Sequence, residues 1–253
     1  MSKHVKIGVF IPNGAQTLDT ACVDVLGVMS KEYLSAIPFL PAHLTALAPD
    51  VTVSYIATPA QGRDIPLTSG LVIKATHDYT EAEVAPGRLD IVVVPGPDPR
   101  VEFDEGGLRW LREQSEAPGV DVLSICTGIF VCGAAGIADG KQASGPRGLQ
   151  DMISNRFPHI KLVGDKHRWV QDGNFWSSGG VTNGNDLMAA YARASSKHWP
   201  EPLVEIGLQL TEVGDRGQFY VDSTSRFVLG FAWRLLRAWF AGFGSANRKI
   251  KAG

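Results

Sequence analysis

The feature that most constrains the fold is a set of short, mostly apolar runs, each of which ends at a turn. Residues 90–94 (DIVVV) stop at Pro95-Gly96-Pro97-Asp98, and residues 120–125 (VDVLSI) stop at Cys126. A strand that is apolar on both faces needs cover on both, as the central strands of parallel sheets have. Because helical segments separate these runs, the sequence predicts an α/β fold with a mostly parallel sheet and helices on both faces.

The remaining segments continue this alternation. Further strands are expected at residues 6–11, 50–57, 67–75, 161–163, 169–171 and 175–178. Helices are expected at residues 20–30, 108–116, 127–137, 184–195 and 203–212. The sequence shows no internal repeat and no long linker, so one domain over residues 1–253 is expected, with an apolar helical extension from about residue 221.

Charge and composition exclude several classes of protein. The 253 residues include 24 Lys and Arg and 26 Asp and Glu, which gives a formal net charge of −2. This balance argues against a nucleic-acid binder, which usually carries a basic patch. The hydrophobic content of 44% is enough for a large core and argues against global disorder. The 28 glycines exceed the usual share of about 7% and indicate many tight turns.

Cysteine and histidine usage argues against structural cross-links. The cysteines, Cys22, Cys126 and Cys132, are odd in number and irregularly spaced, so no disulfide framework is expected. The six histidines form no close ligand cluster with them, so neither a metal nor another cofactor is expected. With no signal-like segment before the first strand and no apolar run of about 18 residues, we expect a soluble cytoplasmic protein without a transmembrane segment.

The C-terminal segment is unusually apolar. Residues 227–243 (FVLGFAWRLLRAWFAGF) contain only two charges, Arg234 and Arg237. Such a stretch usually buries a face in protein, which predicts a core helix or a dimer-interface helix. The nearby tryptophans and arginines are also typical of a helix on a membrane surface, which is the alternative.

The most informative segment is residues 121–135 (DVLSICTGIFVCGAA). An apolar strand ends at Ile125, and a helix of small residues begins just after Cys126. A residue on such a turn lies at the carboxyl edge of the sheet, where open α/β sheets bind ligands. The helix N-terminus favours the thiolate form of a cysteine, so we expect Cys126 to be a nucleophile.

A purely structural interpretation of the cysteines is the alternative. Most free cysteines are inert and buried, and Cys126 can be one of them. Cys132 lies inside the expected helix and Cys22 lies early in the first helix, so both are expected to serve packing.

Four segments resemble the ThiJ/PfpI superfamily, whose fold is that of the class-I glutamine amidotransferases. They are the strand, loop and helix of residues 7–26, the strand ending DIVVVPGPD at residues 90–98, the cysteine segment of residues 124–144, and SSGGVTNGNDLMAAYA at residues 177–192. The resemblance covers most of residues 5–212. It implies a flavodoxin-like three-layer sandwich with a nucleophile elbow at Cys126.

Within this superfamily the chain looks most similar to isocyanide hydratases and to the amidase-like domains of AraC-type regulators. The resemblance rests on Leu18-Asp19 and on Cys126-Thr127-Gly128, where many relatives have Glu in place of Asp19 or His in place of Thr127. It implies Cys126 as nucleophile, Asp19 as proton donor and acceptor, and Thr127 as a polar contact near the reacting atoms. Asp19 is also a preferred helix-capping residue, which is the alternative for it.

These residue types suit isocyanide hydration. Attack of a thiolate on the isocyanide carbon gives a thioimidate, and water then releases an N-substituted formamide. The route needs one soft nucleophile and one carboxyl group that passes protons, and it needs no metal or redox cofactor.

The expected pocket also departs from the family pattern. Glycines at strand ends are expected to wall one pocket, with Gly96, Pro97, Gly128 and Thr182 at the substrate. Pro97 stands where relatives have a second glycine, and proline has no backbone N–H to offer to developing negative charge.

Two other functions remain open from the sequence. In a redox-responsive or stress-protective protein, Cys126 would be oxidised. In a ligand-sensing amidase-like domain, the pocket would bind without turnover. In each case the resemblance implies a homodimer, for which the apolar C-terminal helix offers an interface, and a small molecule as the main partner.

Overall fold

The computed structural model describes residues 3–250, and the side chains of residues 3–239. The chain divides into two compact units, Met1–Phe219 and Tyr220–Gly253. The second unit contains the helix α10 (Thr224–Ile250). The expectation of one domain over residues 1–253 and that of a homodimer both stay predictions.

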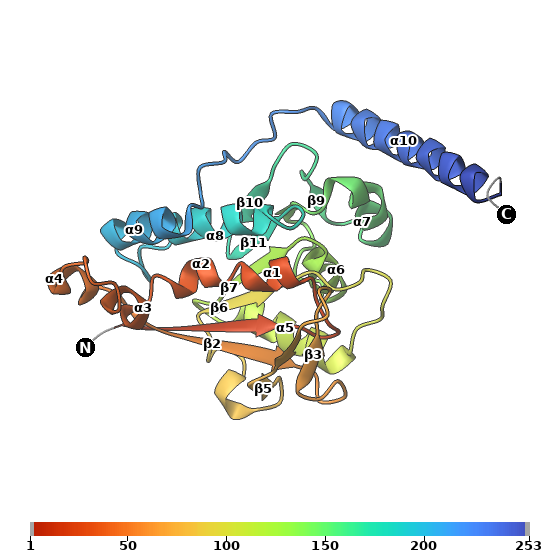
Figure 1. Cartoon of the computed structure of the whole chain (residues 1–253). Coiled ribbons are helices and arrows are strands. Elements are labelled where there is room, and N and C mark those ends of the chain that lie inside the picture. The colour runs from red at the N-terminus through yellow and green to blue at the C-terminus, as the bar shows by residue number, and fades with distance from the viewer. Residues whose placement is uncertain (1–2, 251–253) are drawn as a thin grey trace. The chain divides into compact units, whose positions relative to one another are not determined.

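The first unit is built on a seven-stranded sheet in the order β10-β11-β7-β6-β1-β2-β5 (Figure 1). Its strands are β1 (His4–Phe10), β2 (Asp50–Ala57), β5 (His77–Asp78), β6 (Ile91–Val94), β7 (Asp121–Ile125), β10 (Trp169–Asp172) and β11 (Phe175–Ser178). All neighbouring strands pair in parallel except β10 and β11, which form an antiparallel hairpin. The predicted α/β fold with a mostly parallel sheet is therefore confirmed.

Two short strand pairs lie outside this sheet: β3 (Asp64–Pro66) with β4 (Val72–Lys74), and β8 (Gln142–Ala143) with β9 (Lys161–Leu162). The first unit also contains the helices α1 (Thr17–Ala21), α2 (Asp24–Gly27), α3 (Lys31–Ser35), α4 (Ala42–Thr45), α5 (Glu105–Glu116), α6 (Gly128–Ala134), α7 (Gln150–Arg156), α8 (Asn183–Ala194) and α9 (Glu201–Thr211). Two 3₁₀ turns are η1 (Ala82–Val84) and η2 (Arg147–Leu149).

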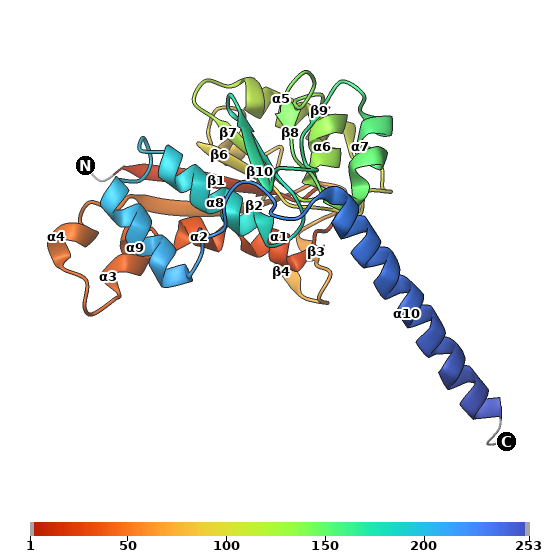
Figure 2. The ribbon, with the colours of Figure 1, turned by 90° about the horizontal axis from the view of Figure 1, so that it is seen from above.

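Strand β6 shows why both faces of the sheet are covered. Its residues Ile91 and Val93 face one core cluster, which includes Leu26 of α2 and Leu187 of α8, whereas Val92 faces the other. The second cluster contains residues of α5 and α6. Figure 2 shows the sheet between these two sets of helices. The alternation follows from the two-residue period of a strand, and it gives the predicted three layers.

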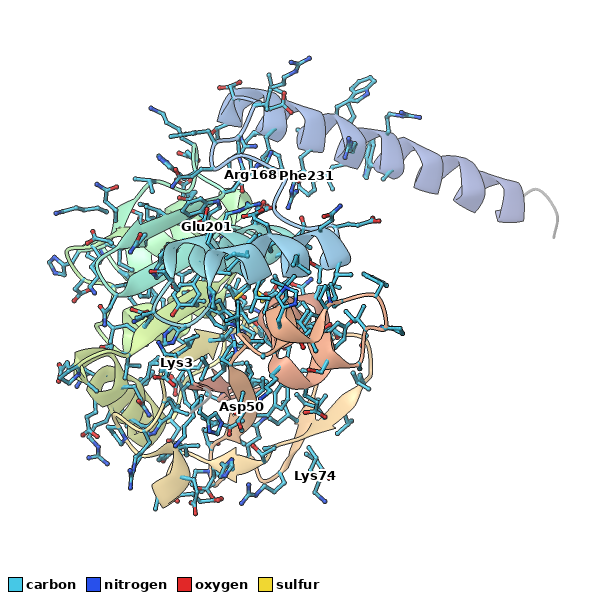
Figure 3. The ribbon with its side chains drawn as sticks, turned by 90° about the vertical axis from the view of Figure 1, so that its left-hand side faces the viewer. Lys3, Asp50, Lys74, Arg168, Glu201 and Phe231 are labelled. Atoms are coloured by element: carbon cyan, nitrogen blue, oxygen red, sulfur yellow. The ribbon has the colours of Figure 1, made fainter. Side chains whose placement is uncertain are left out.

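The order of connections places a switch point between β1 and β6. The chain leaves β1 for β2 on one side, and it continues through β6, β7 and β11 on the other. Strands β1 and β2 begin next to each other, since the Asp50 N–H donates to the Lys3 carbonyl at 2.8 Å (both residues are labelled in Figure 3). Open α/β sheets bind ligands beyond the carboxyl ends of strands at such a point. The loops after β1, β6 and β7 therefore meet where a site is expected.

The expected helix over residues 20–30 is instead broken into α1 and α2. Val25 and Leu26 donate to the carbonyls three residues before them, at 3.2 and 3.0 Å. The Sγ of Cys22 donates to the Asp19 carbonyl at 3.0 Å, which occupies an acceptor that a continuous helix would use. The result is a tighter turn between α1, which contains Asp19, and α2.

Gly128, the first residue of α6, gives a test of how closely the elbow packs on the sheet. A methyl group at residue 128 would collide with the Val94 carbonyl, which is backbone and cannot move aside. We expect Gly128→Ala to lower the free energy of unfolding by about 1–3 kcal/mol, as measured by urea denaturation. Gly148→Ala is the control, because no atom lies within 4 Å of its added methyl group. Equal effects of the two substitutions would contradict this packing.

Candidate active site

The site is centred on Cys126, which follows β7 directly. Cys126 has φ of +56°, and its side chain is only 6% exposed. Its backbone N–H donates to the Ser178 carbonyl of β11 at 3.3 Å. A non-glycine residue with positive φ is strained and is held so only by its surroundings. The predicted nucleophile elbow is therefore present at Cys126.

Asp19 lies behind the elbow and is fully buried. Its Oδ2 accepts from the Gly96 N–H at 3.3 Å, across 77 residues of sequence. Its Oδ1 is buried without a hydrogen-bond partner in the described part of the chain. The N-cap of α1 is Gln16, so the alternative in which Asp19 caps the first helix is wrong.

Gly96 allows these groups to meet. A side chain at residue 96 would come within 2.6 Å of Asp19 Oδ2 and 2.9 Å of the Thr127 nitrogen. Only a residue without a Cβ lets the turn after β6 approach both the carboxyl group and the elbow. The Gly96 carbonyl also accepts from Gln16 N–H at 2.9 Å, which ties the loop after β1 to the same turn.

Burial shifts the pKa values of both Asp19 and Cys126. Burial raises the pKa of the Asp19 carboxyl to about 7, although the Cys126 thiol and the Gly96 N–H both lower it. Burial also raises the pKa of the Cys126 thiol to about 12, and the negative charge of Asp19 adds to this increase. The backbone N–H groups of Thr127 and Val181 act in the opposite direction.

The expectation that the helix N-terminus makes Cys126 a thiolate is therefore wrong for the resting site. The Thr127 N–H at the start of α6 does lower the thiol pKa, but desolvation and the neighbouring carboxylate outweigh it. Asp19 instead can take or hold a proton close to neutral pH, because its pKa is near 7.

A cavity of about 530 Å³ opens in front of Cys126. The described residues that line it are Asn13, Gly14, Ala15, Gln16, Pro66, Thr68, Gly96, Pro97, Asp98, Pro99, Arg100, Cys126 and Thr127. Asp98 and Arg100 pair with each other at 2.6 Å, and this contact lowers the pKa of Asp98 to about 2. Because the two charges neutralise each other, the lining suits a neutral ligand.

The predicted site residues are only partly brought together. Gly96, Pro97 and Thr127 line the cavity beside Cys126, and the Thr127 hydroxyl donates to the Pro97 carbonyl at 2.7 Å. Thr182, predicted at the substrate, lines two other, smaller cavities instead, and its carbonyl accepts from Arg216 at 2.8 Å.

Gly128 was also predicted at the substrate and is not among the described residues of the cavity lining. It packs against the Val94 carbonyl and so serves the close approach of α6 to β6.

Several residues of the site carried no sequence signal. Asn13, Gln16 and Thr68 come from the loops after β1 and β3, where polar residues are common. Val181 has φ of +42°, which a β-branched residue rarely adopts, so its residue type gave no indication of this conformation. The Val181 N–H lowers the pKa of the Cys126 thiol.

The other two cysteines are buried and free, as is Cys126. Burial raises the thiol pKa of both Cys22 and Cys132. One group in the described part of the chain could hold a metal ion: His77, Glu81 and Glu83, near the β5 edge. Glu81 is already paired with Arg63, and none of the three lines the cavity.

The fold and the site define an α/β protein with a cysteine at a nucleophile elbow and a buried acid behind it. The model of the DJ-1/PfpI family matches residues 37–194. This chain belongs to the DJ-1/PfpI family, which confirms the resemblance seen in the sequence.

A curated relative and solved structures agree with this assignment. An isonitrile hydratase of Pseudomonas putida is 34% identical over 158 residues, which is 60% of this chain and 63% of that protein. A ThiJ/PfpI family protein from Pseudomonas syringae superposes with a TM-score of 0.65 at 16% identity, over 94% of this chain and 88% of its own. An AraC family transcriptional regulator from Pseudomonas putida gives 0.61 at 18% identity, over 82% and 99%. These two structures show the fold alone.

The negative charge of Asp19 raises the pKa of the Cys126 thiol, so its removal should make this thiol more reactive. Asp19→Asn removes the negative charge that raises the thiol pKa, so alkylation of Cys126 by iodoacetamide at pH 8 should become about tenfold faster. Mass spectrometry of the Cys126 peptide measures the rate separately from the other two cysteines. Asp24→Asn, an exposed carboxylate on α2, is the matched control and should leave the rate unchanged. Slower or equal alkylation in Asp19→Asn would contradict the assignment.

Proposed function

We propose that this protein hydrates small, neutral isocyanides to N-substituted formamides. The observation that carries the proposal is the buried Asp19 carboxyl, with a pKa of about 7, beside the elbow cysteine. The 34% identity to an isonitrile hydratase supports it, although that match spans 63% of the relative's length.

The first step forms the carbon–sulfur bond. The Asp19 carboxylate takes the thiol proton, and the sulfur electron pair bonds to the terminal carbon of the isocyanide. That carbon becomes electron-rich and takes the proton back from Asp19, which leaves a neutral thioimidate on Cys126. One carboxyl group with a pKa near 7 serves as both base and acid. General acid–base catalysis is most efficient when the pKa of the group lies near the pH at which the enzyme works.

The second step uses water. Asp19 takes a proton from the water molecule that adds to the thioimidate carbon and passes this proton to the nitrogen. The carbon–sulfur bond then breaks with its electron pair going to sulfur, the proton of the new hydroxyl group moves through Asp19 to the sulfur, and N-substituted formamide leaves. The sum is isocyanide plus water giving formamide, with no electron transfer.

The charge of the cavity supports a neutral substrate. Among the described lining residues, the charged side chains are Asp98 and Arg100, and they pair with each other. A charged substrate would compete with this pair for its charges, whereas an isocyanide would not. The volume of about 530 Å³ fits a small molecule.

The geometry favours this function over the redox alternative. Oxidation of a cysteine begins from an accessible thiolate. The Cys126 thiol is 6% exposed and its pKa is raised to about 12, so an oxidant that gains no help from Asp19 in removing the thiol proton would react slowly at neutral pH.

Turnover tests the proposal directly. Incubation of the protein with cyclohexyl isocyanide should give N-cyclohexylformamide, detected by mass spectrometry. Cys126→Ala should abolish turnover, and Asp19→Asn should reduce kcat by about 10²–10⁴-fold because proton transfer is lost. Cys132→Ala, in the interior of α6, is the control for loss of a thiol and should retain activity. Wild-type formamide no higher than in a protein-free reaction contradicts the proposal.

The pH profile tests the role of Asp19 separately. The carboxyl must be ionised to take the thiol proton, and its raised pKa keeps it protonated below about pH 7. We therefore expect kcat/KM to fall about tenfold for each pH unit well below 7. Circular dichroism over the same range checks that the fold persists. A profile that stays flat between pH 5 and pH 9 would show that Asp19 is not the base.

A further inference from the structure

Over residues 224–239, the part whose side chains the structure describes, helix α10 presents one narrow basic face. It spans 27 residues, and Arg226, Arg234 and Arg237 follow one another at spacings of eight and three residues. At 100° per residue these spacings place the three side chains within about 80° of the helix circumference. Gly230 falls between them on the same side. The charged stripe therefore covers less than a quarter of the circumference.

Apart from the arginines, residues 227–239 of the helix are apolar. Phe231, labelled in Figure 3, is 57% exposed, and Trp233 is 61% exposed. The described large apolar side chains of α10 are 41–70% exposed: Phe227, Val228, Leu229, Phe231, Trp233, Leu235, Leu236 and Trp239. Trp233 lies beside the arginine stripe, since residue 226 precedes it by seven positions. Exposed apolar surface of this extent marks an interaction site.

The charge of this part of the chain is of one sign. Residues 223–253 contain six basic residues and no acidic residue, although the whole chain has a net charge of −2. The nearest carboxylate, Asp222, lies just before the helix, 3.6 Å from Arg226. The basic stripe therefore complements a surface that carries negative charge.

A second copy of α10 fits these features poorly. A two-helix seam uses about two positions in seven, whereas the apolar face here covers most of the circumference. Two copies that pair through the apolar face would leave the arginine stripes facing outward, and residues 223–253 offer no carboxylate to pair with them. The sequence-based expectation of a dimer-interface helix is therefore the less favoured one for α10.

A lipid surface is complementary to both the arginine stripe and the apolar face of α10. Helices that lie in the membrane interface have a basic polar face, tryptophan, phenylalanine and leucine on the other, and often 20–30 residues. No helix in the described residues is long and apolar enough to cross a membrane, so α10 would lie along the surface. We propose that α10 binds the surface of membranes that contain anionic lipids. This proposal is independent of the chemistry at Cys126.

Vesicle flotation with the full chain tests the proposal. We expect binding to phosphatidylcholine vesicles that contain about one third phosphatidylserine, and at least tenfold weaker binding to phosphatidylcholine alone. Arg234→Gln/Arg237→Gln should weaken binding to the anionic vesicles roughly 30-fold, because each arginine near such a surface contributes about fivefold. Phe231→Ser/Leu235→Ser should weaken it also, since the apolar face enters the lipid.

The matched control is Arg88→Gln/Lys166→Gln, which removes two charges from exposed side chains of the first unit. It should bind like the wild type. The proposal is overturned by absence of binding to anionic vesicles, by equal binding to both vesicle types, or by equal losses in the two charge variants. Light scattering tests the alternative in which a second copy of the chain covers α10. If Phe231→Ser/Leu235→Ser converts a dimer into a monomer and the wild type does not bind vesicles, the proposal is also overturned.

Discussion

The rest of the site depends on one constraint, the burial of the Asp19 carboxyl between the turn after β6 and the elbow after β7. Gly96 makes this possible, because any Cβ there would lie within 3 Å of both the carboxyl group and the elbow backbone. Burial then sets the chemistry: it raises the pKa of Asp19 to about 7, and the Asp19 charge helps to raise that of Cys126 to about 12. In the proposed reaction the two groups are therefore coupled, since the Cys126 thiol would become reactive as its proton moves to Asp19.

The sequence was sufficient for the features that local pattern controls. The bounds of β2 and β11 match the predicted residues, because alternating or continuous apolar runs with clear ends leave little freedom. The elbow was predictable for the same reason: Cys126 follows directly on a buried strand and precedes a helix of small residues. The role of Asp19 came from family resemblance, since one acid in a short helix carries no signal of its own.

The sequence was insufficient where distant segments decide the outcome. The positive φ of Val181 belongs to a turn whose N–H lowers the pKa of the Cys126 thiol, and these two residues are far apart in the sequence. The break in the helix at Cys22 is local instead, because the Cys22 thiol donates to the carbonyl of Asp19. Thr182 was predicted at the substrate because its segment resembles the family, but the chain turns it toward Arg216 and other cavities. The short helices α3, α4 and α7 were missed because four to seven residues are too few to show a period.

The departure at Pro97 bears on the chemistries open to an elbow cysteine. Acyl transfer puts negative charge on an oxygen and requires N–H donors for it. In the turn after β6, Pro97 has no N–H, and the Gly96 N–H is engaged by Asp19 at 3.3 Å. Addition to an isocyanide puts the electron pair on carbon, where a proton from Asp19 quenches it. The absence of an N–H at Pro97 is therefore compatible with the proposed isocyanide hydration, in which the acid that accepts from the Gly96 N–H would also deliver the proton.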